Sequence, residues 1–452
     1  MKAVAGGVKQ ASAGGMNVFE VAQWYVQNKI LGSIQGMKAL LLDEHTATTV
    51  GLVCSQSRAL ELQVYCVDRL KNPTRRPMGG FRAVCLLRPT GESVRALRDE
   101  LEHPTFDEYH VFFTSTLPDH LLKDLAQADK RQRVQQVQEV FLDYLPLGAD
   151  LFSLDLPSCM PLEPPRWDQP LFDRLCGGLA SALLALKEAP AIVYQRNSPV
   201  ARKVAEEIEE RITKGNHTSD SDLFRFGKSA SQPALLLLLD RRDDPVTPLL
   251  NQWTYTAMVH EALGIKANRV DMSSVPSSGS NSEQEEVVLS SEDDFYMKAE
   301  HMVFGQLGEA LKEVVDELQR QQTGGTGQGS AQSKFTSIGD IQRFMDRYPE
   351  LRRQERTVAK HVALTSELSR IVDKKNLLDQ SELEQELACT EGLTEAFNRV
   401  ETLLEDRGVE WQEKVRLVLL YSLRYELEGE RETRFLERSL SDCSERMVTE
   451  AR

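Results

Sequence analysis

The chain has 452 residues, a formal net charge of −15, and hydrophobic and charged fractions of 41% and 27%; these values are typical of a globular protein long enough for two to four domains. The acidic balance argues against nucleic acid or an anionic membrane surface as a general partner. The seven cysteines form no CxxC pair, which favours buried thiols in a reducing cytosol over disulfides or a zinc site, and no apolar stretch approaches the roughly 20 residues that span a bilayer.

Strands and helices alternate through the first third of the chain, after a small-residue start (1–15) that we expect to be a disordered tail. Short apolar runs predict strands at 37–42, 62–67, 81–87 and 109–113, and alternating apolar residues predict one at 134–145. Amphipathic patterns predict helices at 17–30, 46–60, 91–102 and 118–126. This alternation predicts βαβ units and a mostly parallel, Rossmann-like sheet in a first domain of residues 16–156.

A second α/β domain is predicted after a proline-rich linker at 150–167. Its expected elements are a helix at 171–186, a strand at 191–194, a helix at 200–214 and a strand at Ala234–Leu239. That last strand consists of six consecutive apolar residues, a pattern typical of a strand buried on both faces of a parallel sheet. Thr247-Pro248 then predicts the start of a helix, with threonine as N-cap, and Gly264 predicts its end.

Three aspartates, Asp240, Asp243 and Asp244, follow this strand at the end where ligands collect in α/β folds, so they could bind a metal. Alternatively, they cap the turn and pair with Arg241 and Arg242. The sequence shows no nucleophile–base pair, no P-loop and no metal-ligand spacing, which favours the turn.

Helical patterns dominate the remainder of the chain. Residues 265–428 predict a helical third domain, with one helix at 295–322 and a succession of helices from 338 to 427. Segments rich in Ser, Gly and acidic residues, at 273–286 and 323–333, predict loops. The last segment, residues 426–452, is highly charged and has little apolar face, so we expect it to be frayed or disordered.

The stretch ALLLLLDRRDDPVTPLLNQWTYTAMVHEALGI (234–265) resembles the second domain of the SM family, the Sec/Munc-type regulators of SNARE-mediated membrane fusion. The features that carry the resemblance are a long hydrophobic strand, D-R-x-x-D, a TPLL turn and WTYxAMVHE. The resemblance runs from about Met16 to about Glu426. It implies an arch of two Rossmann-like α/β domains (16–156 and 157–264) and a mainly helical third domain (265–428). In that family the chain continues further and returns to complete the second domain's sheet. We therefore expect domains two and three to be incomplete, and 429–452 to be a divergent charged tail.

The resemblance also implies a function. It predicts a regulator of vesicle docking and fusion that binds a syntaxin-type SNARE of the trans-Golgi network or endosome and promotes assembly of the SNARE helices. Holding helices in register lowers the entropic cost of assembly. The expected protein is not an enzyme and needs no cofactor or metal. It is cytoplasmic and reaches endosomal and Golgi membranes only through its SNARE partners.

The family's pocket for the N-terminal peptide of a syntaxin falls, by position, on five residues of the first domain. They are Leu117, Leu122, Val134, Val137 and Glu139. Four apolar side chains can seat a hydrophobic anchor of the peptide, and the carboxylate can pair with a basic residue. The alternative is that the leucine at 122 and both valines are ordinary core residues.

A second family surface is the cleft between domains one and three, which cradles SNARE helices. Helices at 338–372 and 393–425 would form the third-domain wall. Its basic residues are Arg352, Arg353, Arg356 and Lys360. They either meet acidic SNARE helices or form a solvated face. A helical hairpin that contacts the vesicle SNARE would lie within 280–345.

Two other functions remain open on the residues alone. One is a metal-dependent hydrolase centred on the Asp240 cluster, which would require stabilisation by metal. The other is a helical adaptor without SNARE selectivity, which would bind a syntaxin N-terminal peptide no better than its scrambled version.

Overall fold

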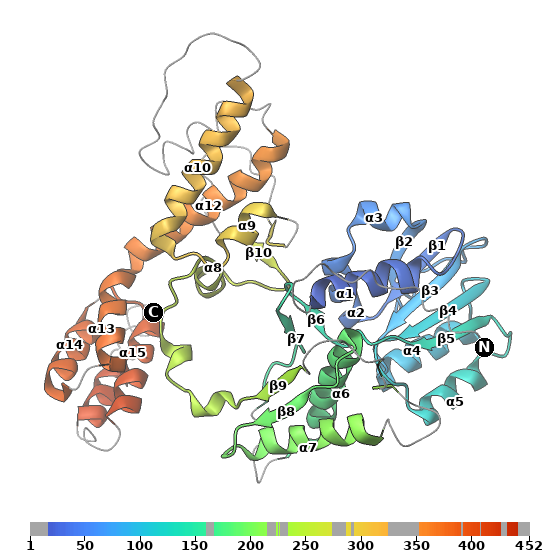
Figure 1. Cartoon of the computed structure of the whole chain (residues 1–452), viewed down its shortest axis with the longest axis horizontal. Helices are drawn as coiled ribbons and strands as arrows, with labels where there is room; N and C mark the ends of the chain where they lie inside the picture. The colour runs from blue at the N-terminus through green and yellow to red at the C-terminus, as the bar shows by residue number, and fades with distance from the viewer. Residues whose placement is uncertain are drawn as a thin grey trace. The chain divides into compact units, whose positions relative to one another are not determined.

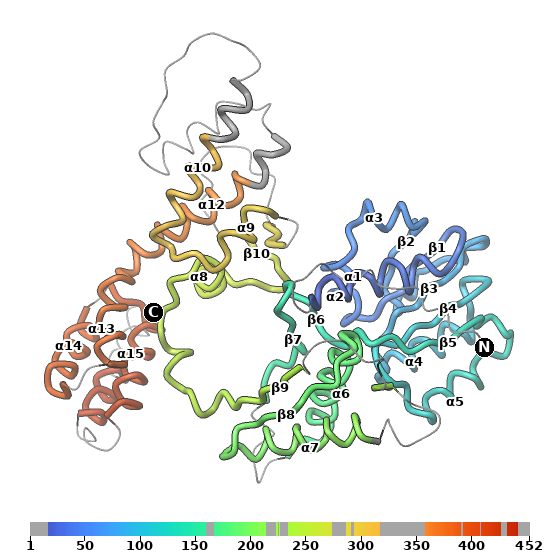
Figure 2. Tube along the Cα trace, in the orientation of Figure 1, coloured from blue at the N-terminus to red at the C-terminus, as the bar shows by residue number. Residues whose placement is uncertain are grey.

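In the computed structural model we describe residues 17–159, 167–214, 223–224, 226, 234–273, 286–290, 293–323, 352–389, 392–406, 408–425 and 432–441. Figure 2 traces the chain and draws residues whose placement is uncertain in grey. The chain forms two compact units, residues 1–240 and 241–452. Each unit is described separately.

The first unit is built on a five-stranded parallel sheet with the order β2-β1-β3-β4-β5 (Figure 1). The strands are β1 Lys38–Leu42, β2 Val64–Arg69, β3 Arg82–Leu87, β4 Glu108–Phe113 and β5 Val134–Glu139. All neighbouring pairs are parallel. This confirms the predicted parallel α/β fold. The strand expected at 134–145 ends at Glu139, because Val140 and Leu142 turn into the core and β6 (Leu145–Pro146) pairs instead with β7 (Phe152–Ser153).

Helices pack on both faces of this sheet. They are α1 Val18–Trp24, a π-helix Tyr25–Leu31, α2 Glu44–Val53, α3 Gln56–Glu61, α4 Gly91–Glu102 and α5 Asp119–Ala128. One apolar core joins the sheet to α1, the π-helix and α2, and a second joins it to α4 and α5. Because residues of the inner strands alternate between these two cores, β1 and β3 are buried on both sides and are almost wholly apolar, whereas the edge strands β2 and β5 alternate with exposed residues.

The rest of the first unit comprises α6 (Gln169–Leu186), α7 (Pro199–Lys214) and a two-stranded parallel sheet of β8 (Ala191–Tyr194) and β9 (Leu235–Leu238). Our prediction that the Ala234–Leu239 strand is buried on both faces is wrong. Leu236 and Leu238 pack against α6 and α7 in one apolar cluster, whereas Leu235, Leu237 and Leu239 are 64%, 55% and 71% exposed. Within the described part of this unit, helices cover only one face of β8 and β9.

The second unit is mainly helical. Its helices are α8 Tyr255–Leu263, α9 Asp294–Ala299, α10 Phe304–Thr323, α12 Arg352–Lys375, α13 Leu377–Cys389, α14 Leu393–Glu405 and α15 Trp411–Arg424. The helix expected at 295–322 is broken between α9 and α10, where the backbone of 302–304 bonds to Trp253 and Tyr255. Two short strands that the sequence analysis missed, β10 (Arg269–Asp271) and β11 (Glu286–Val288), pair antiparallel.

The expected helix start at Thr247-Pro248 is also wrong. Residues Thr247–Leu249 form one 3-10 turn, the chain is extended at Leu250, and α8 begins only at Tyr255. The extension is held from α13, where Glu384 accepts hydrogen bonds from the backbone N (2.8 Å) and Nδ2 (2.7 Å) of Asn251. Tertiary contacts therefore override the local N-cap signal, while Gly264 ends α8 with φ +81° as predicted.

Glu384 yields a pH prediction. Burial, reinforced by the nearby carboxylate of Glu413, raises the pKa of Glu384 to about 7, against the donors of Asn251 and the charge of Arg416. A carboxyl whose folded-state pKa is raised stabilises the fold in its protonated form, so stability falls as pH rises from about 4.5 to 7. Glu384→Gln cannot titrate. We expect the unfolding free energy of E384Q relative to wild type to rise over this range, by up to about 3 kcal/mol.

This difference is measured by urea unfolding of both proteins at several pH values. A difference that stays constant between pH 4.5 and 7 would contradict the assignment. The exposed Glu382, on the same helix, provides the matched control as Glu382→Gln.

The tail prediction needs correction in part. Residues 432–441 are helical, and Leu436 is fully buried in the cluster formed by α13, α14 and α15. The segment is charged, but two leucines four residues apart, Leu436 and Leu440, suffice to anchor a single helix on this cluster. The remaining residues of the expected tail lie outside the described part of the chain.

Candidate syntaxin-binding site

All five predicted pocket residues lie on α5, on β5 or just before α5, at the edge of the first unit's sheet. Val137 pairs with Val111, and Glu139 pairs with Phe113. Since Val111 and Phe113 belong to the apolar core under α4 and α5, the register places Val137 and Glu139 on the face that carries α5. The structure thus assembles the candidate residues on one face of one edge.

Two of the five residues are partly or fully core residues. Leu117 is only 7% exposed and belongs to the core beneath α4 and α5, and Val134 packs against the same core. The alternative of ordinary core packing, which concerned Leu122, Val134 and Val137, holds in part for Val134 only; Leu117, which it did not include, is a core residue. We call these two side chains the floor of the candidate site.

The other two apolar residues are accessible. Leu122 is 43% exposed on α5, and Val137 is 38% exposed on β5. The neighbouring Leu121 and Leu125 of α5 pack on the core instead. An exposed leucine and an exposed valine can receive an apolar side chain of a peptide.

Glu139 is held in place by the backbone. Its Oε1 accepts a hydrogen bond from the backbone N of Leu117 at 2.7 Å. This contact closes the loop between β4 and α5 against the end of β5, and it fixes the carboxylate of Glu139 at the rim of the site. A fixed, exposed carboxylate can pair with a basic residue of a ligand. The contact spans 22 residues, so no local sequence pattern indicates it.

One of the four basic residues predicted to line the third-domain wall is not available to a partner. Lys360 is bound internally: its Nζ donates to the carbonyl oxygen of Val288 at 2.8 Å and forms an ion pair with Asp293. It is therefore part of neither a solvated face nor a SNARE-binding face. The side chains of Arg352, Arg353 and Arg356 lie outside the described residues, as do residues 324–345 of the expected hairpin at 280–345.

The aspartate cluster after β9 behaves as a turn. Asp240 accepts a hydrogen bond from Ser198 Oγ at 2.6 Å. Arg241 pairs with Asp244 at 2.8 Å, and Asp244 accepts from the backbone N of Thr247 at 3.1 Å. Among the described residues, no group of three or more His, Cys, Asp or Glu side chains is arranged to hold a metal ion.

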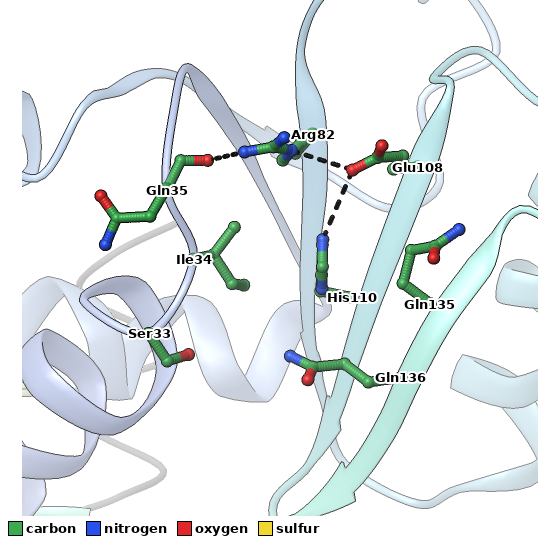
Figure 3. A pocket seen from close by; sticks show the side chains of 8 residues that line it. All are labelled: Ser33, Ile34, Gln35, Arg82, Glu108, His110, Gln135 and Gln136. Carbon is green, nitrogen blue, oxygen red and sulfur yellow. Dashed lines mark hydrogen bonds and ion pairs between the residues drawn. The ribbon is translucent and has the colours of Figure 1, made fainter.

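Sequence reasoning missed a polar cavity at the opposite end of the same sheet (Figure 3). It is lined by Ser33, Ile34, Gln35, Arg82, Glu108, His110, Gln135 and Gln136. These residues come from one loop and three strands that span about a hundred positions of the sequence, so only the parallel register of β3, β4 and β5 brings them together.

Comparison with known proteins decides the family. The family model described as the Sec1 family matches residues 38–448. The chain belongs to the Sec1 family. Vacuolar protein sorting-associated protein 45 of Dictyostelium discoideum is 40% identical over 412 residues, which cover 91% of this chain and 70% of that protein. The Homo sapiens protein of the same name is 39% identical over the same shares of the two chains.

Solved structures of SM proteins support the same family assignment. The structure of the SM protein Vps45 is 38% identical and has a TM-score of 0.80, covering 95% of this chain and 76% of that chain. The SM protein Vps45 in complex with the Qa SNARE Tlg2 is 40% identical and has a TM-score of 0.82, covering 95% and 74%. These findings confirm the predicted SM family and the α/β plus α fold. The family match continues to residue 448, so the expectation that the resemblance ends near Glu426 is wrong.

Neither the hydrolase nor the unselective adaptor gains support from these relatives, and the match fits a regulator better than an enzyme. No helix among the described residues has the length and apolar character needed to cross a membrane.

Proposed function

We propose that this chain is an SM-type regulator of SNARE-mediated vesicle docking and fusion, which binds a syntaxin-type SNARE and promotes SNARE complex assembly. The observation that carries the proposal is the 40% identity, over 95% of this chain, to an SM protein solved in complex with a Qa SNARE. A protein of this kind needs no cofactor, because its work is to hold helices in register before they zip together.

The finer parts of the proposal concern place and domain organisation. We place the protein peripherally on endosomal and Golgi membranes, brought there by its SNARE partners. We also propose domains at 16–156, 157–264 and 265–428, supported by the parallel sheet, the small sheet of β8 and β9, and the helices from α8 onward. The compact units divide the chain elsewhere, at Asp240.

The N-terminal peptide of the syntaxin is proposed to bind at the edge formed by α5 and β5. Leu122 and Val137 would contact the peptide's apolar anchor above the floor of Leu117 and Val134, and Glu139 would pair with its basic residue. The support is the accessibility of the two rim residues and the fixed carboxylate.

The test is the affinity of the purified chain for syntaxin N-terminal peptides, with a Leu122→Arg variant alongside. A charge in an apolar contact must be desolvated, which should cost about 2–3 kcal/mol and weaken micromolar binding by roughly 30- to 150-fold. Because Leu122 is exposed, the variant should fold normally, and circular dichroism checks this.

Leu60 provides the matched control, since it is a leucine of similar exposure (48%) on α3, away from the proposed site. Leu60→Arg should leave peptide affinity unchanged. If the wild type binds the peptide and its scrambled version equally, SNARE selectivity is absent. If L122R and L60R weaken binding to the same extent, the peptide binds elsewhere.

A further inference from the structure

The second unit contains two apolar cores. One is formed by α8, β10, β11, α9, α10 and α12, which we call the α8–α12 half. The other is formed by α13, α14, α15 and the helix at 432–441, which we call the α13–α15 half. Among the described residues, no buried side chain belongs to both cores. Polar side chains join the halves, and an interface of this kind permits one half to move against the other.

The chain passes between the two halves at two places. The first is Asn376, the single residue between α12 and α13, which has φ +51° and so breaks the helix in the left-handed region that asparagine tolerates. The second lies at residues 251 and 252, because Leu250 packs on the core of the α13–α15 half and Trp253 on the core of the α8–α12 half. Two such crossings define an axis, and hinges are commonly a few residues of this kind.

Three residues form a clasp at the second crossing. Asn251 donates from its backbone N and Nδ2 to the two carboxylate oxygens of Glu384 on α13, and its Oδ1 accepts from Arg416 Nη1 of α15 at 2.8 Å. We call this the Asn251 clasp. Glu384 is only 2% exposed. The charged side chains around the clasp are Arg416 and Glu413 of α15, Glu410 at the start of α15, Glu261 of α8 and Lys375 of α12.

We propose that the second unit has an internal hinge at Asn376 and residues 251–252, which the Asn251 clasp holds closed and ionisation of Glu384 opens. In the closed clasp an ionised Glu384 is buried close to a second carboxylate, Glu413, and such a charge is costly. Opening the clasp exposes Glu384 to water and removes that cost. The hinge sets the angle between the two halves, so a helical partner that contacts both of them would sense it.

The direction of the pH effect follows from the environment of Glu384. Burial, with the charge of Glu413, raises the pKa of Glu384 from 4.5 to about 7 in the closed clasp. Water returns this pKa toward 4.5 when the clasp opens. The protonated carboxyl therefore favours the closed form, and that preference is lost as pH rises from 4.5 to 7. Between pH 5 and pH 8 the ratio of open to closed clasp should rise roughly 70-fold.

Hydrogen exchange of the full chain measures the clasp directly. The backbone amide of Asn251 donates to Glu384, so its protection factor, corrected for intrinsic exchange, reports the opening. We expect this protection to fall roughly 70-fold between pH 5 and pH 8 in the wild type. In Glu384→Gln it should not depend on pH. Glu382→Gln changes an exposed carboxylate of the same helix and should behave as the wild type.

The hinge itself is tested by the distance between two spin labels, carried by non-natural residues at the exposed positions Lys298 of α9 and Thr402 of α14. Asn251→Asp removes a donor and places a second carboxylate against Glu384, so at pH 8 a new distance should appear, and at pH 5 it should weaken. Adding Glu384→Gln to N251D should restore the closed distance at pH 8. That recovery cannot arise from misfolding, so it keeps the test decisive.

Four results would overturn the proposal. Protection of Asn251 that does not change with pH, or that changes equally in E384Q, would show that Glu384 does not control the clasp. Loss of protection at Leu364 and Leu387 together with Asn251 would show that the whole unit unfolds. An unchanged distance in N251D would show that no hinge moves. None of these results depends on whether the chain binds a syntaxin.

Discussion

Replacing Asp293 with alanine should lower the free energy of unfolding of the second unit by about 3–5 kcal/mol. Asp293 is 5% exposed and precedes α9. Its Oδ1 accepts hydrogen bonds from the backbone N of Phe295 and of Tyr296, both at 3.0 Å, so it caps that helix. Loss of such a cap alone costs about 1 kcal/mol.

The larger part of the effect comes from the other carboxylate oxygen. Asp293 Oδ2 contacts His361 Nε2 at 2.9 Å and pairs with Lys360. His361 is fully buried, and its Nδ1 lies 2.7 Å from the hydroxyl of Tyr255. In D293A the imidazole N–H has no acceptor and the ammonium has no counter-charge. A buried donor left unpaired costs about 1–3 kcal/mol, and a partly buried cation costs more.

The protonation states follow from the same contacts. Burial opposes ionisation of Asp293, but the hydrogen bonds from His361 and Lys360 outweigh it and hold the pKa of this carboxyl well below its usual range. Burial lowers the pKa of His361, and the charge of Asp293 only partly compensates. His361 is therefore neutral at pH 7, donating from Nε2 to Asp293 and accepting at Nδ1 from the hydroxyl of Tyr255.

The measurement is urea unfolding, followed by hydrogen exchange in α9 and α12 to report on the second unit. Asp294 offers the matched control, because it is exposed and lies next in the chain. Asp294→Ala should change stability by no more than about 0.5 kcal/mol. If D293A and D294A unfold at the same urea concentration, the buried cluster contributes nothing.

Local signals in the sequence predicted local structure well. The helix α4 has the predicted bounds, Gly91–Glu102, because its cap and its apolar stripe both lie within a dozen residues. Thr90 Oγ1 accepts a hydrogen bond from the backbone N of Ser93 at 3.1 Å, and Val94, Leu97 and Leu101 face the core. For a helix such as α4, whose cap and apolar stripe are both close in the sequence, the periodicity of apolar residues is sufficient to predict the bounds.

Prediction failed where distant residues decide. Nothing near Thr247 reveals that Glu384, 133 residues away, holds Asn251 extended and delays the helix to Tyr255. Six apolar residues at Ala234–Leu239 indicate a strand, but which faces are covered depends on what packs there. Composition cannot distinguish one covered face from two.

The sequence predicted which residues form the candidate site, but it did not predict their exposure, because exposure depends on contacts between distant residues. Resemblance by position selected five residues, and the fold brings them to one edge of the sheet. It did not separate the buried floor at Leu117 from the accessible rim at Leu122 and Val137, because exposure depends on how α5 is rotated over the sheet. The contact of Glu139 with the backbone of Leu117 was also invisible in the sequence.

The second large effect concerns the first unit, where Asp143→Ala should lower the unfolding free energy by about 3–5 kcal/mol. Asp143 is 5% exposed and lies between β5 and β6. Its Oδ1 pairs with Arg88 Nε at 2.7 Å and its Oδ2 with Arg174 Nη1 at 3.3 Å. Its backbone N donates to Ser181 Oγ at 2.9 Å. One carboxylate thus joins the end of β3 to α6.

Removing that carboxylate leaves two guanidinium groups, with side chains 15% and 18% exposed, that repel each other, and only the weaker attraction of Asp155 for Arg174 remains. Repulsion and incomplete hydration then add to the lost hydrogen bonds. Asp143→Asn retains an acceptor and should cost less. Asp173→Ala, which removes an exposed carboxylate of α6 beside Arg174, should stay within about 0.5 kcal/mol of wild type.

A triple variant separates the unpaired charge from lost packing. Asp143→Leu combined with Arg88→Met and Arg174→Met replaces the three charges with apolar side chains of similar length. Since a buried ion cluster is often no more stable than well-packed apolar residues, this variant should recover most of the stability that D143A loses. Urea unfolding, with hydrogen exchange followed in α6, measures the four variants and the wild type. If the triple variant is as unstable as D143A, the loss comes from the shape of the junction between β3 and α6, and the unpaired guanidinium groups are not its cause.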